Sequence, residues 1–170
     1  ALPIFSYIVG ARLKSTASTL KERILDSKNY RRIKKEYYVA EIQDGGRRII
    51  VSYSAKRARK DARDRKRAIK KLMAKLDRSK SARSHLSNHG YRKYLKLEGA
   101  SKVVLDEEKI ALDTKWDGLH GVVTNSNLDP VETLKKYNEL WNVEAAFRVT
   151  KHDLKVRPVY HWKPRRIKAH

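Results

Sequence analysis

The sequence predicts a mixed α/β protein, and three observations support that fold class. Short apolar segments alternate or cluster between Gly, Asp and Asn, which is typical of strands. Asp44-Gly45-Gly46 separates two such segments, and its glycines accept positive φ, so these residues predict a β-hairpin. Two longer segments, 54–78 and 130–151, instead repeat apolar residues at helical spacing.

The predicted strands occur on both sides of the first long helix. Pro3 to Ala11 is rich in β-branched and aromatic residues and precedes a polar stretch, so we expect a buried strand leaving a core. A short helix is expected from Leu20 to Leu25. The remaining predicted strands are Tyr37–Ile42 and Arg47–Ser52 of the hairpin, then Tyr94–Leu97, Lys102–Leu105, Lys109–Leu112 and Leu119–Thr124.

The charge of the chain restricts its function. Its 170 residues include 41 Lys+Arg and 19 Asp+Glu, giving a net charge of +22 and a pI near 10.3. A charge of this size favours a polyanionic partner, and nucleic acid is the first candidate because neutralised phosphates release counterions. A ribosomal or membrane-surface role would give a similar composition.

Other classes are excluded by composition. The chain has no Cys, so it has no disulfides and no thiolate zinc site. It has no apolar stretch of roughly 18 residues and no signal-peptide pattern at its start. We therefore expect a cytoplasmic protein with no membrane partner. The six histidines show no ligand spacing that predicts a metal site.

The segment 54–78 predicts a basic helix. It contains no Gly or Pro, and one stripe is apolar while most of the rest is Lys or Arg. We expect contacts to phosphates without sequence reading; a solvated face packed through the alanine stripe is the alternative. Asp61 and Asp64 are expected to pair with Arg neighbours in the helix. The stripe is Ala55, Ala58, Ala62, Ile69, Leu72 and Leu76, and the expected DNA-binding residues are Arg57, Arg59, Lys60, Arg63, Arg67, Lys70 and Lys71.

The helix from Pro130 to Lys151 places three polar residues on one face. Tyr137, Glu144 and Lys151 are seven residues apart, which is about 700° of helical rotation. A carboxylate between a phenol and an ammonium group suits a divalent metal beside phosphate oxygens. An exposed face of unpaired side chains is the alternative. The large residues Trp141 and Phe147 are interpreted as core, and Asp117 as the cap of a turn before Gly118.

The same helix resembles a family signature. Residues 137–151 read YNELWNVEAAFRVTK, which is similar to the Tyr-x2-Arg-x3-Glu-x6-Lys signature of bacterial insertion-sequence transposases with a ribonuclease-H-like DDE core. Tyr137, Glu144 and Lys151 match, whereas Leu140 occupies the Arg position. The resemblance extends to WDGLHGVVTN, LKVRPVYHW, RRIKAH, YIVGARLKS and AKRARKDARDRKRA, and so covers most of the chain.

The resemblance implies DNA transposition. Two metal ions, Mg²⁺ or Mn²⁺, held by two Asp and one Glu would activate water and then a 3′-hydroxyl. Glu144 would be the third acid and a metal ligand, while Tyr137, Arg148 and Lys151 would contact the transposon end. The first two acids are expected upstream of Pro3, so we expect an inactive fragment that does not bind the metals alone.

The expected organisation follows from this resemblance. Residues 1–14 would be a strand of a partial ribonuclease-H-like core, residues 15–115 an inserted β-rich domain with basic helix 54–78, and residues 116–170 a core segment with Glu-bearing helix 130–151. The expected partners are DNA at the transposon ends and full-length transposase or a second copy, in the bacterial nucleoid. Two alternatives remain: a non-enzymatic basic module binding DNA or structural RNA, and a truncated transposase that interferes with intact copies.

Overall fold

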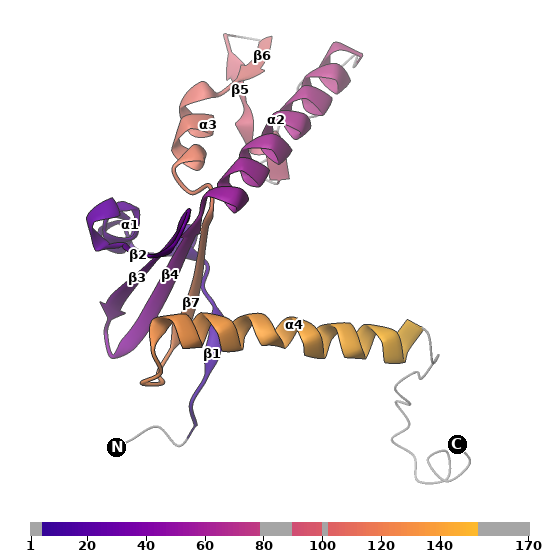
Figure 1. Cartoon of the computed structure of the whole chain (residues 1–170). Coiled ribbons are helices and arrows are strands. Elements are labelled where there is room, and N and C mark those ends of the chain that lie inside the picture. The colour runs from indigo at the N-terminus through magenta and orange to yellow at the C-terminus, as the bar shows by residue number, and fades with distance from the viewer. Residues whose placement is uncertain (1–4, 79–89, 100–101, 153–170) are drawn as a thin grey trace, which may run out of the picture. The chain divides into compact units, whose positions relative to one another are not determined.

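Five antiparallel strands form the main sheet of the computed structural model, which describes residues 5–78, 90–99 and 102–152 (Figure 1). The sheet order is β1-β7-β4-β3-β2. The mixed α/β class is therefore confirmed. The strands are β1 (Ile8–Gly10), β2 (Arg31–Lys34), β3 (Tyr37–Asp44), β4 (Arg47–Ser54) and β7 (Leu119–Thr124).

The hairpin at the centre of the sheet forms where the sequence predicts it. β3 and β4 pair from Tyr37 opposite Ser54 to Asp44 opposite Arg47. Gly45 and Gly46 have φ values of 53° and 77°. Two central residues with positive φ make the tight turn whose twist matches that of the flanking strands.

One face of the sheet contains the main hydrophobic cluster. Ile42 of β3 lies opposite Ile49 of β4, and both are buried. They belong to one cluster with Leu20 and Ile24 of α1 (Ser18–Leu25) and with Leu13 of η1 (Leu13–Ser15). Burying each such side chain contributes roughly 1.5–3 kcal/mol, so η1 and α1 are held firmly against the sheet.

The basic helix α2 spans Ala55–Asp77 and begins at Ser54, whose hydroxyl accepts from the Arg57 N–H at 3.4 Å. Its predicted apolar stripe is confirmed in part. Leu72 is buried and Ile69 and Leu76 are half-buried, whereas Ala62 is exposed.

The prediction of a strand at Lys109–Leu112 is wrong, because these residues lie in helix α3 (Glu107–Thr114). Asp106 caps the helix by accepting from the Lys109 N–H at 3.1 Å, and Glu107 and Glu108 occupy the first turn. An N-cap followed by acidic residues is a helix-start signal, and here it outweighs a short apolar run. Before α3 come η4 (Gly90–Tyr94) and a two-stranded sheet of β5 (Leu95–Glu98) and β6 (Lys102–Leu105).

The first strand is shorter and more exposed than predicted. Among the described residues β1 ends the order of the main sheet and pairs with β7. Val9 is 49% exposed and Tyr7 37%, so the expectation of a buried strand is wrong. Pro3 and Ile4 lie outside the described residues.

The Glu-bearing helix α4 spans Pro130–His152, close to the predicted 130–151. The chain divides into two units, 1–130 and 131–170. The predicted three-part organisation stays a prediction, although β1 and β7 share one sheet with β3 and β4. No helix in the described ranges is long and apolar enough to cross a membrane.

Candidate nucleic-acid interface

Basic side chains line one face of α2, here called the cationic stripe. Each member lies three or four residues from another member, which places them on one side of a helix. All are exposed, and from first to last they extend over about 22 Å at 1.5 Å per residue. Apart from a 3.8 Å contact between Arg67 and Asp64, no ion pair involves the stripe within the described part of the chain. The stripe consists of Lys56, Lys60, Arg63, Arg67, Lys70 and Lys71.

Two of the predicted phosphate-binding residues lie beside the stripe and are paired. Arg59 donates to both oxygens of Glu36, at 3.0 and 2.9 Å, and these bonds lower the pKa of Glu36. Glu36 has a φ of 59° between β2 and β3, and its carbonyl accepts from the Ala55 N–H at 3.1 Å. Arg57 lies 3.9 Å from Asp61, one turn along the helix. Phosphate would therefore compete with Glu36 for Arg59.

The opposite face of α2 holds an arginine with a structural role. Arg65 donates to both oxygens of Asp117, at 2.6 and 2.5 Å, and the two side chains are only 12% and 14% exposed. The hydrogen bonds to Asp117 raise the pKa of Arg65, against its burial. Arg65 thus ties α2 to the turn before β7 and is not available to a partner.

The turn cap predicted at Asp117 is made by another carboxylate. Asp61 accepts from the Gly118 N–H at 3.0 Å. Gly118 has a φ of 81°, and a Cβ there would lie 2.7 Å from the Ser54 carbonyl oxygen, so glycine is required at this close approach. The prediction that Asp61 and Asp64 pair with Arg neighbours in the helix is confirmed, since Asp61 lies 3.9 Å from Arg57 and Asp64 lies 3.8 Å from Arg67.

A second carboxylate, Asp113 at the end of α3, joins three elements. It accepts from Lys14 of η1 at 2.9 Å, from the Tyr94 hydroxyl at 2.6 Å and from Lys93. Burial alone would raise the pKa of Asp113, but the bonds from Lys93, Tyr94 and Lys14 hold it well below its usual range. Asp113 is therefore ionised and attaches α3 to η1 and η4.

The predicted site residues of α4 belong to the second unit of the chain, residues 131–170. Glu144 is exposed and Tyr137 half-buried, and both line an open hollow beside the helix. Lys151 lies in α4, but its side chain is outside what the structure describes. Trp141 and Phe147 are 59% and 71% exposed, so their interpretation as core residues is wrong.

Arg148 lies on the same helix. Its guanidinium stacks over the Trp141 ring, 5.3 Å from the ring centre. A guanidinium over an indole face is a stabilising arrangement that also leaves the charge near the surface. Arg148 therefore remains able to meet a phosphate while it partly covers Trp141.

The donor set around Glu144 does not by itself fit a metal ion. In residues 5–78, 90–99 and 102–152 no group of three or more His, Asp or Glu side chains could hold one. The first two acids of a DDE site are thus not supplied by the described residues, and no catalytic step can be derived from them.

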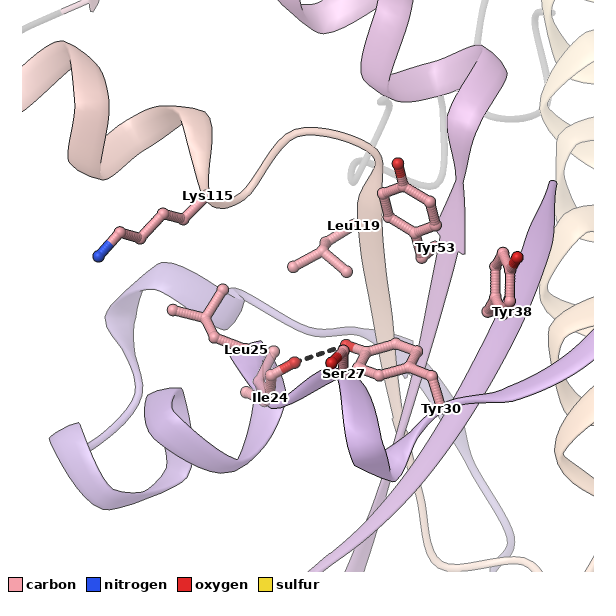
Figure 2. Close-up of a pocket in the computed structure, with 8 residues that line it drawn as sticks. All are labelled: Ile24, Leu25, Ser27, Tyr30, Tyr38, Tyr53, Lys115 and Leu119. Atoms are coloured by element: carbon pink, nitrogen blue, oxygen red, sulfur yellow. Dashed lines mark hydrogen bonds between the residues drawn. The ribbon is translucent and has the colours of Figure 1, made fainter.

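An apolar pocket of about 440 Å³ lies between α1 and the sheet (Figure 2). Tyr38 and Tyr53 line it, with ring centres 6.0 Å apart. Tyr30 also lines it and donates its hydroxyl to the Ile24 carbonyl at 2.6 Å; burial raises its pKa to about 12. None of the predicted site residues lines this pocket.

A basic pocket was not predicted from the sequence. Its basic lining residues, three cations and one histidine, come from η1 and the residue before it, the first turn of α2, and β7. No spacing in the sequence connects these positions, and only the tertiary fold brings them together. They are Arg12, Lys14, Arg57 and His120.

Comparison of the chain with known protein families, with curated proteins and with solved structures finds no match.

Proposed function

We propose that the chain binds DNA through the cationic stripe of α2, as part of a bacterial insertion-sequence DDE transposase. One observation carries the DNA-binding proposal: apart from Asp64, which lies 3.8 Å from Arg67, the described acids of α2 and its surroundings pair away from the stripe, so most of its charges have no acidic partner. Asp61 binds the Gly118 N–H and Asp117 binds Arg65. A linear row of unneutralised charge matches a phosphate backbone.

The stripe suits backbone contact more than base reading. The ammonium groups of lysine and the guanidinium groups of arginine bind backbone phosphates whatever the base sequence. Such contacts position a protein on the duplex without specifying bases. Each contact releases counterions, so six full contacts would give a salt slope of about −5 for duplex DNA. This proposal predicts strong, salt-sensitive and sequence-tolerant binding.

The transposase part of the proposal is supported by α4. Tyr137, Glu144 and Lys151 lie on one continuous helix, as the resemblance implies, with Glu144 as the third acid. The finer fold, a ribonuclease-H-like core, is supported by the order of β7 followed directly by α4. In an assembled site with two further Asp, Mg²⁺ or Mn²⁺ would supply the chemistry for phosphodiester cleavage.

The test is a salt titration of binding to a duplex of random sequence. The stripe variant Lys60→Gln, Arg63→Gln, Lys70→Gln should reduce the salt slope by about 2.7, since each lost phosphate contact removes about 0.9. The matched control carries the same charge change on exposed residues elsewhere, Lys28→Gln, Arg32→Gln and Lys96→Gln. An equal loss in both variants would mean that net charge alone drives binding, and the stripe proposal would be wrong.

The second candidate, a basic module for structural RNA, is favoured by the charge of +22. The same titration with duplex RNA distinguishes the RNA-binding module from the DNA-binding transposase. Tighter binding to RNA than to DNA at equal salt would favour the RNA-binding module. Products formed on the DNA with Mg²⁺ or Mn²⁺ should also be run on a denaturing gel. Metal-dependent nicking that Glu144→Gln abolishes would support the transposase and place a working site in this chain.

A further inference from the structure

The basic pocket has a volume of about 280 Å³. At roughly 30 Å³ per water it has room for about nine waters, enough for a phosphate group and part of its nucleotide. Its lining contains no acidic residue among those described, whereas the neighbouring hollow is lined by Asp61, Asp64, Asp113 and Asp117. That hollow is also lined by Lys14, Arg65 and Lys93, so acidic and basic groups face each other there, whereas the described lining of the basic pocket has basic groups without an acid.

The pocket forms where η1 and the residues before it pack closely against Gly121 of β7. A Cβ at Gly121 would lie 2.4 Å from Cδ2 of Leu13, and the Ala11 N–H donates to the Gly121 carbonyl at 2.8 Å. Leu13 is buried in the main cluster. These contacts fix the Arg12–Ser15 segment over β7, so the basic side chains that it carries are pre-positioned.

The ion pairs around the pocket leave it positive. Lys14 shares the single carboxylate of Asp113 with Lys93, so one of these two charges is not balanced. Arg57 reaches Asp61 only at 3.9 Å. Arg12 is exposed and makes no ion pair within the described residues.

The pKa of His120 is sensitive to the charge of the pocket. Burial lowers its pKa, and the nearby Arg57 lowers it further. The charged groups that face it across the pocket are Arg12 and Lys14 from the η1 segment and Arg57 from α2. An anion among these groups would oppose the effect of Arg57 and raise the pKa of His120.

We propose that this pocket binds one phosphate group of a nucleic-acid backbone, with Arg12 and Arg57 as charged donors and Ser15 and His120 as polar neighbours. The inference rests on the proposed function, because it names a phosphate subsite at the start of the helix that carries the stripe. Trp116 also lines the pocket and offers a ring against which a sugar or base can stack.

The test follows the His120 imidazole signals by NMR during pH titrations. One sample contains inorganic phosphate, a second contains a 12-base-pair duplex, and a third contains chloride at the same ionic strength. The other five histidines of the chain serve as internal references. Saturable binding with a raised His120 pKa in either the phosphate or the duplex arm, and not with chloride, is expected.

Arg12→Gln should weaken the phosphate response by about tenfold, the usual effect of losing one charge-assisted hydrogen bond. The matched control is Arg32→Gln, which makes the same charge change at an exposed residue of β2 and should leave the response unchanged. Arg57→Gln is the second variant and should act like Arg12→Gln.

The outcomes separate the two proposals. A duplex that binds without any shift of His120, together with no response to inorganic phosphate, overturns the pocket and leaves the stripe intact. Saturable inorganic phosphate binding without duplex binding supports the pocket as a phosphate site and removes the nucleic-acid proposal. Equal loss in the Arg12 and Arg32 variants would also overturn the pocket.

Discussion

Removing the Arg65 guanidinium should destabilise the protein although Arg65 lies in a helix rich in other cations. Arg65→Met keeps most of the side-chain length but removes two charge-assisted hydrogen bonds, of 2.6 and 2.5 Å, to Asp117. It also leaves a carboxylate that is only 14% exposed without a partner. Breaking a fully buried pair costs about 3–5 kcal/mol; allowing for the partial exposure, we expect about 3 kcal/mol.

The assay is equilibrium unfolding in urea, with thermal unfolding as a second readout. A loss of about 3 kcal/mol should lower the Tm by roughly 6–12 °C for a chain of this size. Asp117→Asn should be similarly destabilising, and the double variant should be less unstable than the sum by about 1–2 kcal/mol, because the pair then acts as a unit.

The matched control for Arg65 is Arg63→Met, two residues away on the exposed stripe. Arg63 makes no ion pair among the described residues, so its replacement should change stability by no more than about 0.5 kcal/mol while weakening DNA binding. If Arg65→Met and Arg63→Met unfold at the same urea concentration, the ion pair contributes nothing and the reasoning is refuted.

Two further predictions concern the packing around η1 and α3. Gly121→Ala should destabilise by about 1–3 kcal/mol in urea unfolding, because the new methyl group would overlap Leu13; a neutral result would mean that η1 moves freely. Asp113 has a lower pKa when folded than unfolded, so its ionised form stabilises the fold above pH 4 or so, and this contribution is lost as the pH falls through the folded-state pKa. In Asp113→Asn the free energy of unfolding should therefore fall less steeply as the pH is lowered below about 4. An unchanged pH dependence in that variant would contradict the lowered pKa of Asp113.

Local signals in the sequence were sufficient for much of the fold. The Gly45-Gly46 turn needs positive φ, which only a few residue types accept readily, and so it predicted the hairpin. The helices α2 and α4 were found from periodicity over long segments. The strand predicted at Lys109–Leu112 shows the limit, since a short apolar run is equally compatible with one turn of a capped helix.

Some parts of the candidate site could likewise be predicted from the sequence, and others could not. The stripe could be predicted because its members lie on one helix, whose geometry follows from spacing alone. The basic pocket could not, because Arg12, Arg57 and His120 are separated by 45 or more residues in sequence and meet only through tertiary contacts. Spacing also separates Arg65 from the exposed Arg63, because Arg65 lies seven residues from both Ala58 and Leu72 and so falls on the apolar side of α2. Its partner Asp117 is supplied only by the tertiary structure.

The distribution of acids explains how a chain of charge +22 can fold and still present a positive surface. Asp61, Asp113 and Asp117 all accept hydrogen bonds at junctions between elements. The low exposure of Asp113 and Asp117, 16% and 14%, makes their charge-assisted bonds stronger than they would be in water. Acids used in this way stabilise the fold but screen little of the outer face of α2. The repulsion that remains along the stripe opposes helix formation slightly, and a bound polyanion would relieve it. Stability should therefore rise in the presence of duplex DNA, and the rise should diminish with added salt as binding weakens.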